Sequence, residues 1–127
     1  MELLPLALFT FTHHVTKKKG EYILLGSVRA LLKDANLEGN KFWGTIFVRN
    51  LSYRKKVKVV YSVDNWKSTK EVDASFQCPF DEQHEIWHFS TPVEPGTDHV
   101  EFAIAYTVND AIYWDNNLYR NYTRTVA

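Results

Sequence analysis

Residues 99–114 read HVEFAIAYTVNDAIYW, and this stretch decides the fold. Every second residue between positions 100 and 108 is large and apolar, which is the period of a strand with one buried face. Asn109 and Asp110 follow, and both residue types tolerate the positive φ angles of a two-residue hairpin turn. Residues 111–114 are apolar again, so the stretch predicts a β-hairpin.

Further short strands are predicted in the sequence before and after this hairpin. They are predicted at residues 28–33, 42–49, 57–63, 71–77, 85–90 and 122–126. About eight strands at roughly ten-residue spacing predict an all-β, immunoglobulin-like antiparallel β-sandwich. Aromatic residues flanked by apolar residues two positions away are expected in its core: Phe47, Tyr61, Trp87, Phe102 and Tyr106.

The chain length of 127 residues suits a single domain. Residues 1–20 are predicted to be an N-terminal extension, and residues 21–127 the folded module. The apolar run at residues 3–9 lacks a basic start and a cleavage site, so no signal peptide is predicted. It is also too short to span a bilayer.

The charge balance argues for a neutral partner. Lysine plus arginine and aspartate plus glutamate number 15 each, so the net charge is zero. This gives no electrostatic reason to expect nucleic acid or a membrane as partner. Cys78 is the single cysteine, which excludes an internal disulfide and a cysteine-based zinc site. With the missing signal peptide, it favours a cytoplasmic over a secreted location.

No catalytic residue, metal ligand or cofactor is predicted. Asp81, Glu82 and Glu85 are acids by type only, and their place between Pro79 and the next strand is typical of solvated carboxylates. The histidines lack the spacing of a metal motif. A glycine-rich phosphate loop is also missing from the sequence.

Several aromatic residues stand where a core ring is not expected. Trp66 follows a predicted strand among polar residues, so it is either a lid over the core or an exposed platform, and we favour the platform. Trp114 ends a strand and precedes Asp115, Asn116 and Asn117. Its indole therefore stands next to side chains that can form hydrogen bonds. Tyr53 stands in a basic turn. Phe76 is either a platform or a core residue.

Three segments carry a family resemblance. Residues 50–57, residues 64–67 and residues 113–117 with Asn121 and Tyr122 are similar to the family 21 carbohydrate-binding modules. These modules occur in fungal amylolytic enzymes such as glucoamylases and in glycogen-targeting regulatory subunits of protein phosphatase 1. The resemblance covers roughly residues 25–125. It implies an immunoglobulin-like sandwich that binds α-1,4-linked glucans, namely starch, glycogen or cyclodextrin, without catalysis.

The resemblance also implies two glucan sites. One contains two rings and three amides: Trp66, Trp114, Asn116, Asn117 and Asn121. The other contains two rings, with Lys55 nearby: Tyr53 and Phe76. His84 stands where relatives carry a tyrosine and can still stack on a sugar, whereas Ala103 stands where some carry an aromatic ring. Tyr119 could supply a further ring.

The partner implied is an α-glucan polysaccharide or oligosaccharide. Protein phosphatase 1 or its substrates are further expected partners, through the Trp114–Tyr122 loop or through regions outside this sequence. Residues 56–59 fail the phosphatase-docking pattern at its last position, yet the cysteine usage leans towards a phosphatase-targeting parent. One alternative is a protein-interaction domain that uses the Trp114–Tyr122 loop. Another is a single-stranded nucleic-acid binder using Arg54, Lys55 and Lys56, which the zero net charge disfavours.

Overall fold

The computed structural model describes residues 14–18, 21–25 and 29–126, with the backbone alone up to residue 25. Every regular element in these ranges is a strand. No stretch of the described chain forms a helix long and apolar enough to cross a membrane. Strands β1 (His14–Lys18) and β2 (Glu21–Leu25) pair as an antiparallel hairpin. Residues 1–13, 19 and 20 of the predicted N-terminal extension lie outside the described residues.

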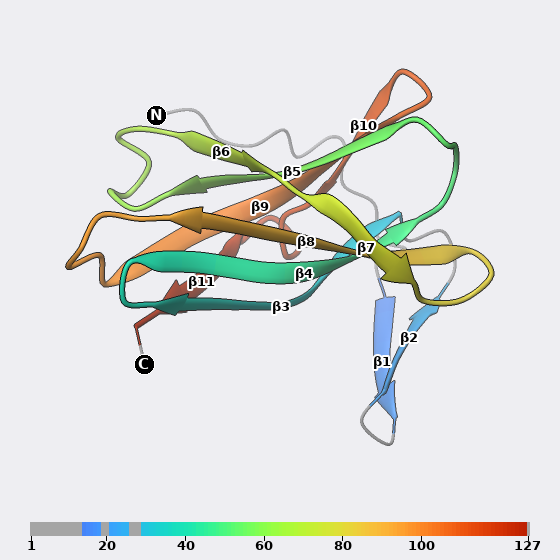
Figure 1. Cartoon of the computed structure of the whole chain (residues 1–127), viewed down its shortest axis with the longest axis horizontal. Coiled ribbons are helices and arrows are strands. Elements are labelled where there is room, and N and C mark those ends of the chain that lie inside the picture. Colours follow the sequence, from blue (N-terminus) through green and yellow to red (C-terminus); the bar gives the residue numbers. More distant parts are fainter. Residues whose placement is uncertain (1–13, 19–20, 26–28, 127) are drawn as a thin grey trace.

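Two antiparallel sheets pack face to face and confirm the predicted sandwich (Figure 1). The five-stranded sheet has the order β10-β9-β5-β6, with β11 also paired to β9. Its strands are β5 (Lys55–Ser62), β6 (Lys70–Asp73), β9 (His99–Val108), β10 (Ala111–Asp115) and β11 (Tyr122–Thr125). The four-stranded sheet has the order β3-β4-β8-β7. Its strands are β3 (Ala30–Glu38), β4 (Lys41–Arg49), β7 (Ser75–Pro79) and β8 (His84–Pro92).

The predicted hairpin is present as β9 and β10. Asn109 and Asp110 have φ angles of 50° and 61°, as the turn prediction required. The alternating apolar residues of β9 point into the core, where Phe42 meets Tyr61, Phe89 and Phe102 edge-on at ring distances of 5.0–5.5 Å. The core positions predicted for Phe47, Tyr61, Phe102 and Tyr106 are confirmed, and Trp87 packs half-buried against the core.

The first predicted strand differs from the structure in its bounds. Residue 28 lies outside the described residues, and within them the strand begins at Ala30 and runs to Glu38. Asp34 and Asn36 are poor strand formers, so the pattern beyond residue 33 was not recognised as a strand. A bulge between Leu32 and Asp34 lies opposite β4. A Cβ atom on Gly44 would lie 2.4 Å from the Asp34 carbonyl oxygen, which explains a glycine there.

The strand predicted at residues 71–77 is wrong as one element. It divides at Ala74, whose N–H donates to the Val57 carbonyl oxygen at 2.8 Å. Before this residue β6 pairs with β5, and after it β7 pairs with β8 in the other sheet. The sequence did not predict this division, because a strand-like pattern can continue unchanged while the strand changes its pairing partner.

Candidate functional site

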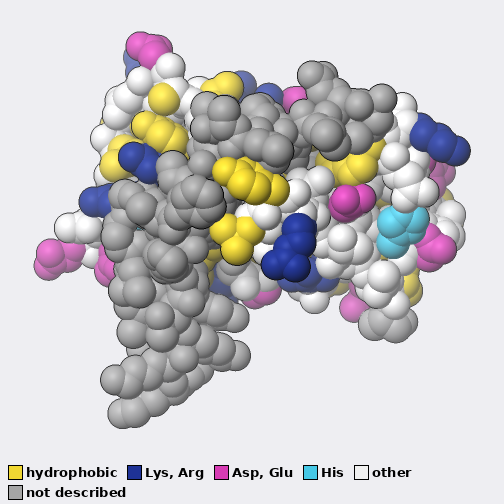
Figure 2. Space-filling view, turned by 180° about the vertical axis from the view of Figure 1, so that it is seen from behind, with side chains coloured by type: hydrophobic (Ala, Val, Ile, Leu, Met, Phe, Trp, Pro, Cys, Tyr) yellow, Lys and Arg dark blue, Asp and Glu magenta, His cyan; other side chains and the backbone are white. Residues whose placement is uncertain are grey.

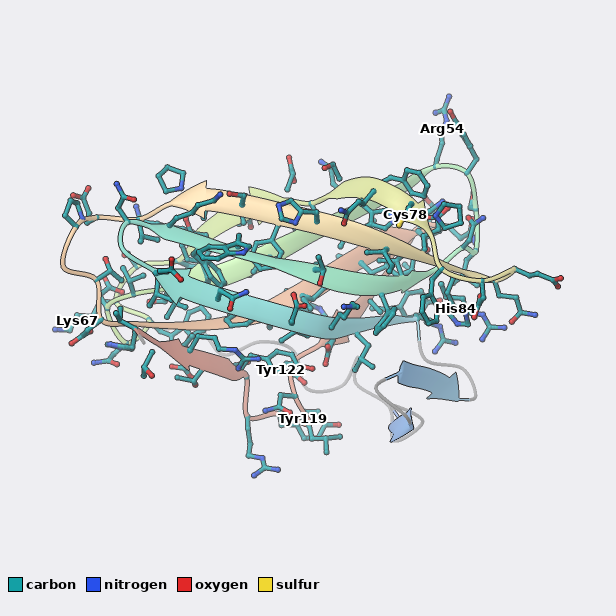
Figure 3. All side chains as sticks on the ribbon, turned by 60° about the horizontal axis from the view of Figure 1, so that its bottom comes forward. Arg54, Lys67, Cys78, His84, Tyr119 and Tyr122 are labelled. Carbon is teal, nitrogen blue, oxygen red and sulfur yellow. The ribbon has the colours of Figure 1, made fainter. Side chains whose placement is uncertain are left out.

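Two loops meet at one end of the sandwich. The Asn50 N–H donates to the Gln83 carbonyl oxygen at 2.8 Å, and Arg49 pairs with His84. The Tyr106 hydroxyl donates to the Arg49 carbonyl oxygen at 2.6 Å, and burial raises the pKa of Tyr106 to about 12. The loop that carries Tyr53 is thereby held beside the loop before β8. Figure 3 shows Arg54, Cys78 and His84 at this end and Lys67 at the other.

Four of the predicted site residues gather here, together with two further ones. We call this group the Tyr53 cluster: Tyr53, Lys55, Phe76, His84, Glu85 and Trp87. Tyr53 is 95% exposed and Phe76 is 50% exposed, so both rings are open to a ligand. The Phe76 and Trp87 rings meet edge to face at a centroid distance of 6.3 Å.

Lys55 is the polar centre of the Tyr53 cluster. Its ammonium group donates to the Asn50 side-chain oxygen at 2.8 Å and to the Ser52 carbonyl oxygen at 2.7 Å. Glu85 Oε1 lies 3.4 Å from the same nitrogen and accepts the Trp87 indole N–H at 2.9 Å. These contacts connect the Tyr53 loop to the Phe76 ring through buried or half-buried side chains.

Glu85 corrects the sequence interpretation. Its carboxylate is half-buried and paired with Lys55, whereas a solvated side chain was expected. The available signal was alternation, because Glu85 shares a strand face with Trp87 and Phe89 and therefore points towards the opposite sheet.

His84 is held by an acid on the loop before it. Its Nδ1 lies 2.8 Å from an Asp81 carboxylate oxygen. Burial opposes ionisation of Asp81, but hydrogen bonds from the Gln83 N–H and the His84 ring outweigh it and lower the pKa of Asp81. The imidazole is therefore fixed in orientation at the edge of the cluster.

Trp66 was expected to be an exposed platform, and this expectation is wrong, because the indole is only 8% exposed. Asn65 and Trp66 both have positive φ angles, so the chain reverses directly after β5. The Ser62 hydroxyl accepts the Trp66 N–H at 2.8 Å and donates to Asp64 at 2.8 Å. The turn is thus closed from within, and Trp66 lies against the protein.

Trp114 lies on the outer face of the five-stranded sheet. It pairs with Ala105, whose neighbours Ile104 and Tyr106 point into the core. Val60, Ala103 and Ala105 also point away from the core between the sheets, yet all three are buried. The small side chains of Ala103 and Ala105 leave room on this face for the Trp114 ring. The Trp114 indole nitrogen is buried, and it has no hydrogen-bond partner within the described part of the chain.

The loop after Trp114 uses its predicted amides for its own folding. Asn116 is 1% exposed, and its side-chain oxygen accepts the Tyr119 N–H at 3.1 Å. The Asn117 amide donates to the Asn121 carbonyl oxygen at 3.1 Å. Buried within the loop, Asn116 is not the open sugar-binding side chain that was expected. Tyr119, 39% exposed, is the accessible ring of this loop.

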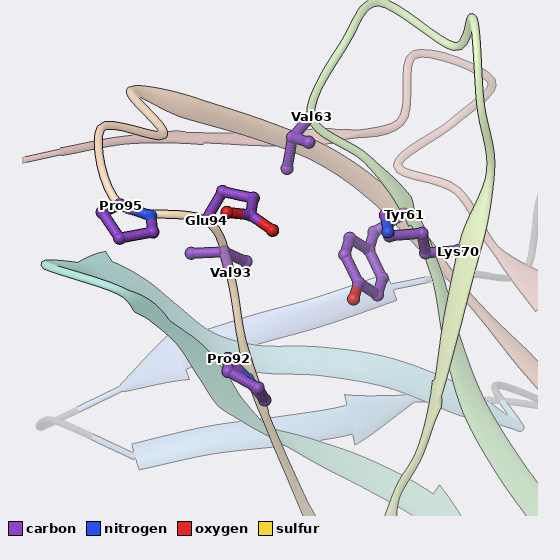
Figure 4. Close-up of a pocket in the computed structure, with 7 residues that line it drawn as sticks. All are labelled: Tyr61, Val63, Lys70, Pro92, Val93, Glu94 and Pro95. Carbon is purple, nitrogen blue, oxygen red and sulfur yellow. The ribbon is translucent and has the colours of Figure 1, made fainter.

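A pocket of about 330 Å³ lies at the end of the sandwich away from Tyr53 (Figure 4). Tyr61, Val63 and Lys70 line one side, and residues 92–95 line the other. No predicted site residue lines it.

Within the described residues, no group of three acids, histidines or cysteines could hold a metal ion. Figure 2 shows basic and acidic side chains interspersed on the face seen from behind.

Known proteins are similar to this chain in sequence and in fold. Residues 14–125 match the family described as carbohydrate/starch-binding module (family 21). Protein phosphatase 1 regulatory subunit 3C of Bos taurus is 31% identical over 96 residues, which cover 72% of this chain and 30% of that protein. Glucoamylase 1 of Rhizopus oryzae is 37% identical over 100 residues, which cover 76% of this chain and 16% of that protein.

A solved structure agrees with the sequence matches. The starch-binding domain of Rhizopus oryzae glucoamylase, in complex with β-cyclodextrin and maltoheptaose, superposes with a TM-score of 0.66 at 34% identity. The match covers 80% of this chain and 97% of that domain. The chain belongs to the family 21 carbohydrate/starch-binding modules. It spans less than a third of the length of the two full-length relatives.

Proposed function

We propose that this module binds α-1,4-linked glucans such as starch, glycogen or cyclodextrin, and that it tethers a parent protein to polysaccharide without catalysis of its own. The observation that carries the proposal is the 95% exposed Tyr53 ring beside the half-exposed Phe76 ring. Large exposed rings with a few fixed polar groups are typical of ligand sites.

The Tyr53 cluster has the chemistry that a pyranose needs. The C–H face of a glucose residue can pack on the exposed tyrosine ring, and hydroxyls at its edge can bond to Asn50 and Glu85, which Lys55 holds in place. Because these polar groups are already fixed by one another, little side-chain entropy is lost on binding. His84, oriented by Asp81, lies on the other face of β8 from Glu85 and is a further candidate partner at this end of the sandwich.

A second, weaker glucan site is proposed at Trp114. Tyr119 would supply the open ring, with Asn117 and Asn121 at its edge, and Trp66 is the further ring that the family resemblance assigns to this site. The 39% exposure of the Tyr119 ring supports this assignment, because it leaves one ring of the loop accessible to a ligand. The buried positions of Trp66 and Asn116 argue for the lower affinity.

The parent protein is proposed to be a glycogen-targeting phosphatase subunit in preference to an amylolytic enzyme. Both kinds occur among the relatives. The preference rests on the single cysteine, since few cysteines and no internal disulfide suit a reducing compartment. Protein phosphatase 1 or its substrates would then be partners of the whole protein.

Protein docking through the Trp114–Tyr122 loop is a second candidate function. Leu118 is 47% exposed and Tyr119 is 39% exposed, and both have positive φ angles. Exposed side chains held in a costly backbone conformation are frequent at recognition sites. Competition separates the two functions, because free glucan should displace a protein partner only where the surfaces overlap.

Calorimetric titration with β-cyclodextrin tests the proposal. The expected Kd lies between about micromolar and sub-millimolar, since few contacts are made. Tyr53→Ala should weaken binding at least about tenfold, because an anchoring ring is removed. Tyr53→Phe keeps the ring and should retain most of the affinity.

Val126→Ala serves as the control, since Val126 is exposed and bonds to Asp98, at the opposite end of β9 from the Tyr53 loop. Unchanged affinity in Tyr53→Ala would refute the Tyr53 cluster as the main site. No heat of binding at millimolar cyclodextrin would refute glucan binding and favour the docking function.

A further inference from the structure

A cleft of about 490 Å³ is lined by residues of the loop that carries Tyr53. Its two walls are the Ser52–Lys56 segment and the Thr107–Asp110 turn. Strand pairing holds the walls together, since Lys56 pairs with Thr107 and Lys55 with Val108. The cleft is shallow and largely open to solvent.

The cleft carries positive charge that the nearby protein does not neutralise. Lys55 is paired with Glu85, but Arg54 and Lys56 are exposed, and neither forms an ion pair within the described residues. Asp110 is the one acid among the lining residues. Because the chain as a whole has no net charge, this surplus is local to the cleft.

The remaining polar lining suits an oxyanion. Ser52 and Thr107 offer hydroxyl donors, and Asn109 offers an amide. A guanidinium binds two oxygens of a phosphate at once, and an ammonium adds a point charge. A neutral glucan cannot form ion pairs with two exposed cations, whereas a phosphate ester can.

We propose that this cleft binds a phosphate monoester on the same α-glucan that stacks on Tyr53, so that the module prefers phosphorylated glucan. The inference rests on the proposed glucan binding. Tyr53 lies between Ser52 and Arg54 in the sequence, and both line the cleft. Lys55 also lines the cleft and donates to the Ser52 carbonyl oxygen, so the two sites share one loop.

The test compares two samples of one glucan. Maltodextrins that carry phosphate monoesters are titrated into the 127-residue chain before and after their phosphate is removed with a phosphatase. The phosphorylated sample should bind about five- to tenfold more tightly, as expected for two exposed charge pairs. The difference should shrink in 0.5 M NaCl, because salt screens exposed charges.

Variants assign the effect to the cleft. Arg54→Gln combined with Lys56→Gln should bring the two affinities within about twofold of each other. Asp110→Asn should increase the preference, because it removes the one acid among the lining residues. Lys41→Gln is the control, since Lys41 begins β4 at the opposite end of that strand from the Tyr53 loop and should leave the preference unchanged.

Three results would overturn the inference. Equal affinity for the two glucan samples would refute the phosphate site and leave glucan binding intact. Binding of neither sample would refute both proposals. A single-stranded oligonucleotide that binds as tightly and is not displaced by phosphorylated maltodextrin would assign the cations to nucleic acid.

Discussion

At the scale of single residues, Asp64 holds the turn that buries Trp66. The Ser68 N–H and hydroxyl donate to its carboxylate at 3.0 and 2.7 Å, and the Ser62 hydroxyl donates at 2.8 Å. These hydrogen bonds hold the pKa of Asp64 at about 2, below its ordinary value of 3.8. The same Ser62 hydroxyl accepts the Trp66 N–H, so the charge on Asp64 and the position of the indole are connected.

The depressed pKa predicts how acid affects stability. The contribution of ionised Asp64 is complete above its unfolded pKa near 3.8 and is lost as the pH falls through about 2. The thermal midpoint of Asp64→Asn should therefore lie below that of the wild type at pH 5. The gap should close between about pH 4 and pH 2, as circular dichroism can measure. A gap of constant size would show that the carboxylate charge does not stabilise the turn.

At the scale of elements, the loop between β10 and β11 is shaped by strained backbone. Asn117, Leu118 and Tyr119 have φ angles of 55°, 56° and 74°, and Asn121 has 58°. Asparagine tolerates this region, but leucine and tyrosine rarely adopt it. The hydrogen bonds of Asn116 and Asn117 within the loop hold the conformation in place.

Glycine at position 118 should relieve part of this strain. Leu118→Gly is expected to raise the free energy of unfolding by about 0.5–1 kcal/mol, because the left-handed conformation costs a side chain more than glycine loses in entropy. Little packing is lost, since Leu118 is 47% exposed. Urea denaturation measures the change, and Leu118→Ala, which keeps the Cβ atom, should show no gain. A destabilised glycine variant would mean that the leucine side chain packs usefully.

At the scale of the whole molecule, Asp115 connects the two sheets. Its buried carboxylate on β10 accepts the Leu32 N–H of β3 at 2.8 Å and the Tyr122 hydroxyl of β11 at 2.6 Å. Burial, strengthened by the charge on Asp115, raises the pKa of Tyr122 far above its ordinary value, so this hydroxyl remains a donor. One side chain thereby fixes the loop that carries Tyr119 to the opposite layer.

Removal of the Tyr122 hydroxyl should weaken this connection. Tyr122→Phe is expected to cost about 1.5–3 kcal/mol of unfolding free energy, because a buried carboxylate loses a donor. The ring itself should remain stacked on Phe102, at a centroid distance of 5.4 Å. Tyr113→Phe is the matched control and should cost less than about 0.5 kcal/mol, since no hydrogen bond of its hydroxyl is seen among the described residues. Equal costs in the two variants would contradict the role of Asp115.

Local pattern was sufficient for most of the strands and for most of the core. The hairpin at residues 99–114 and its Asn109–Asp110 turn follow from period-two alternation and from backbone preferences, which act between near neighbours in the sequence. Tyr61, Phe102 and Tyr106 were placed in the core for the same reason. The three segments that resemble family 21 modules likewise pointed to the family that the comparisons confirm.

Only the tertiary structure decided how these elements meet. The change of sheet at Ala74, the buried side of Trp66 and the pairing of Lys55 with Glu85 all depend on contacts between residues distant in the sequence. The Leu32–Asp115 hydrogen bond joins residues 83 positions apart. Alternation states that a side chain faces one side of its strand, but the partner on that side is set by the packing of two sheets, which no local pattern contains.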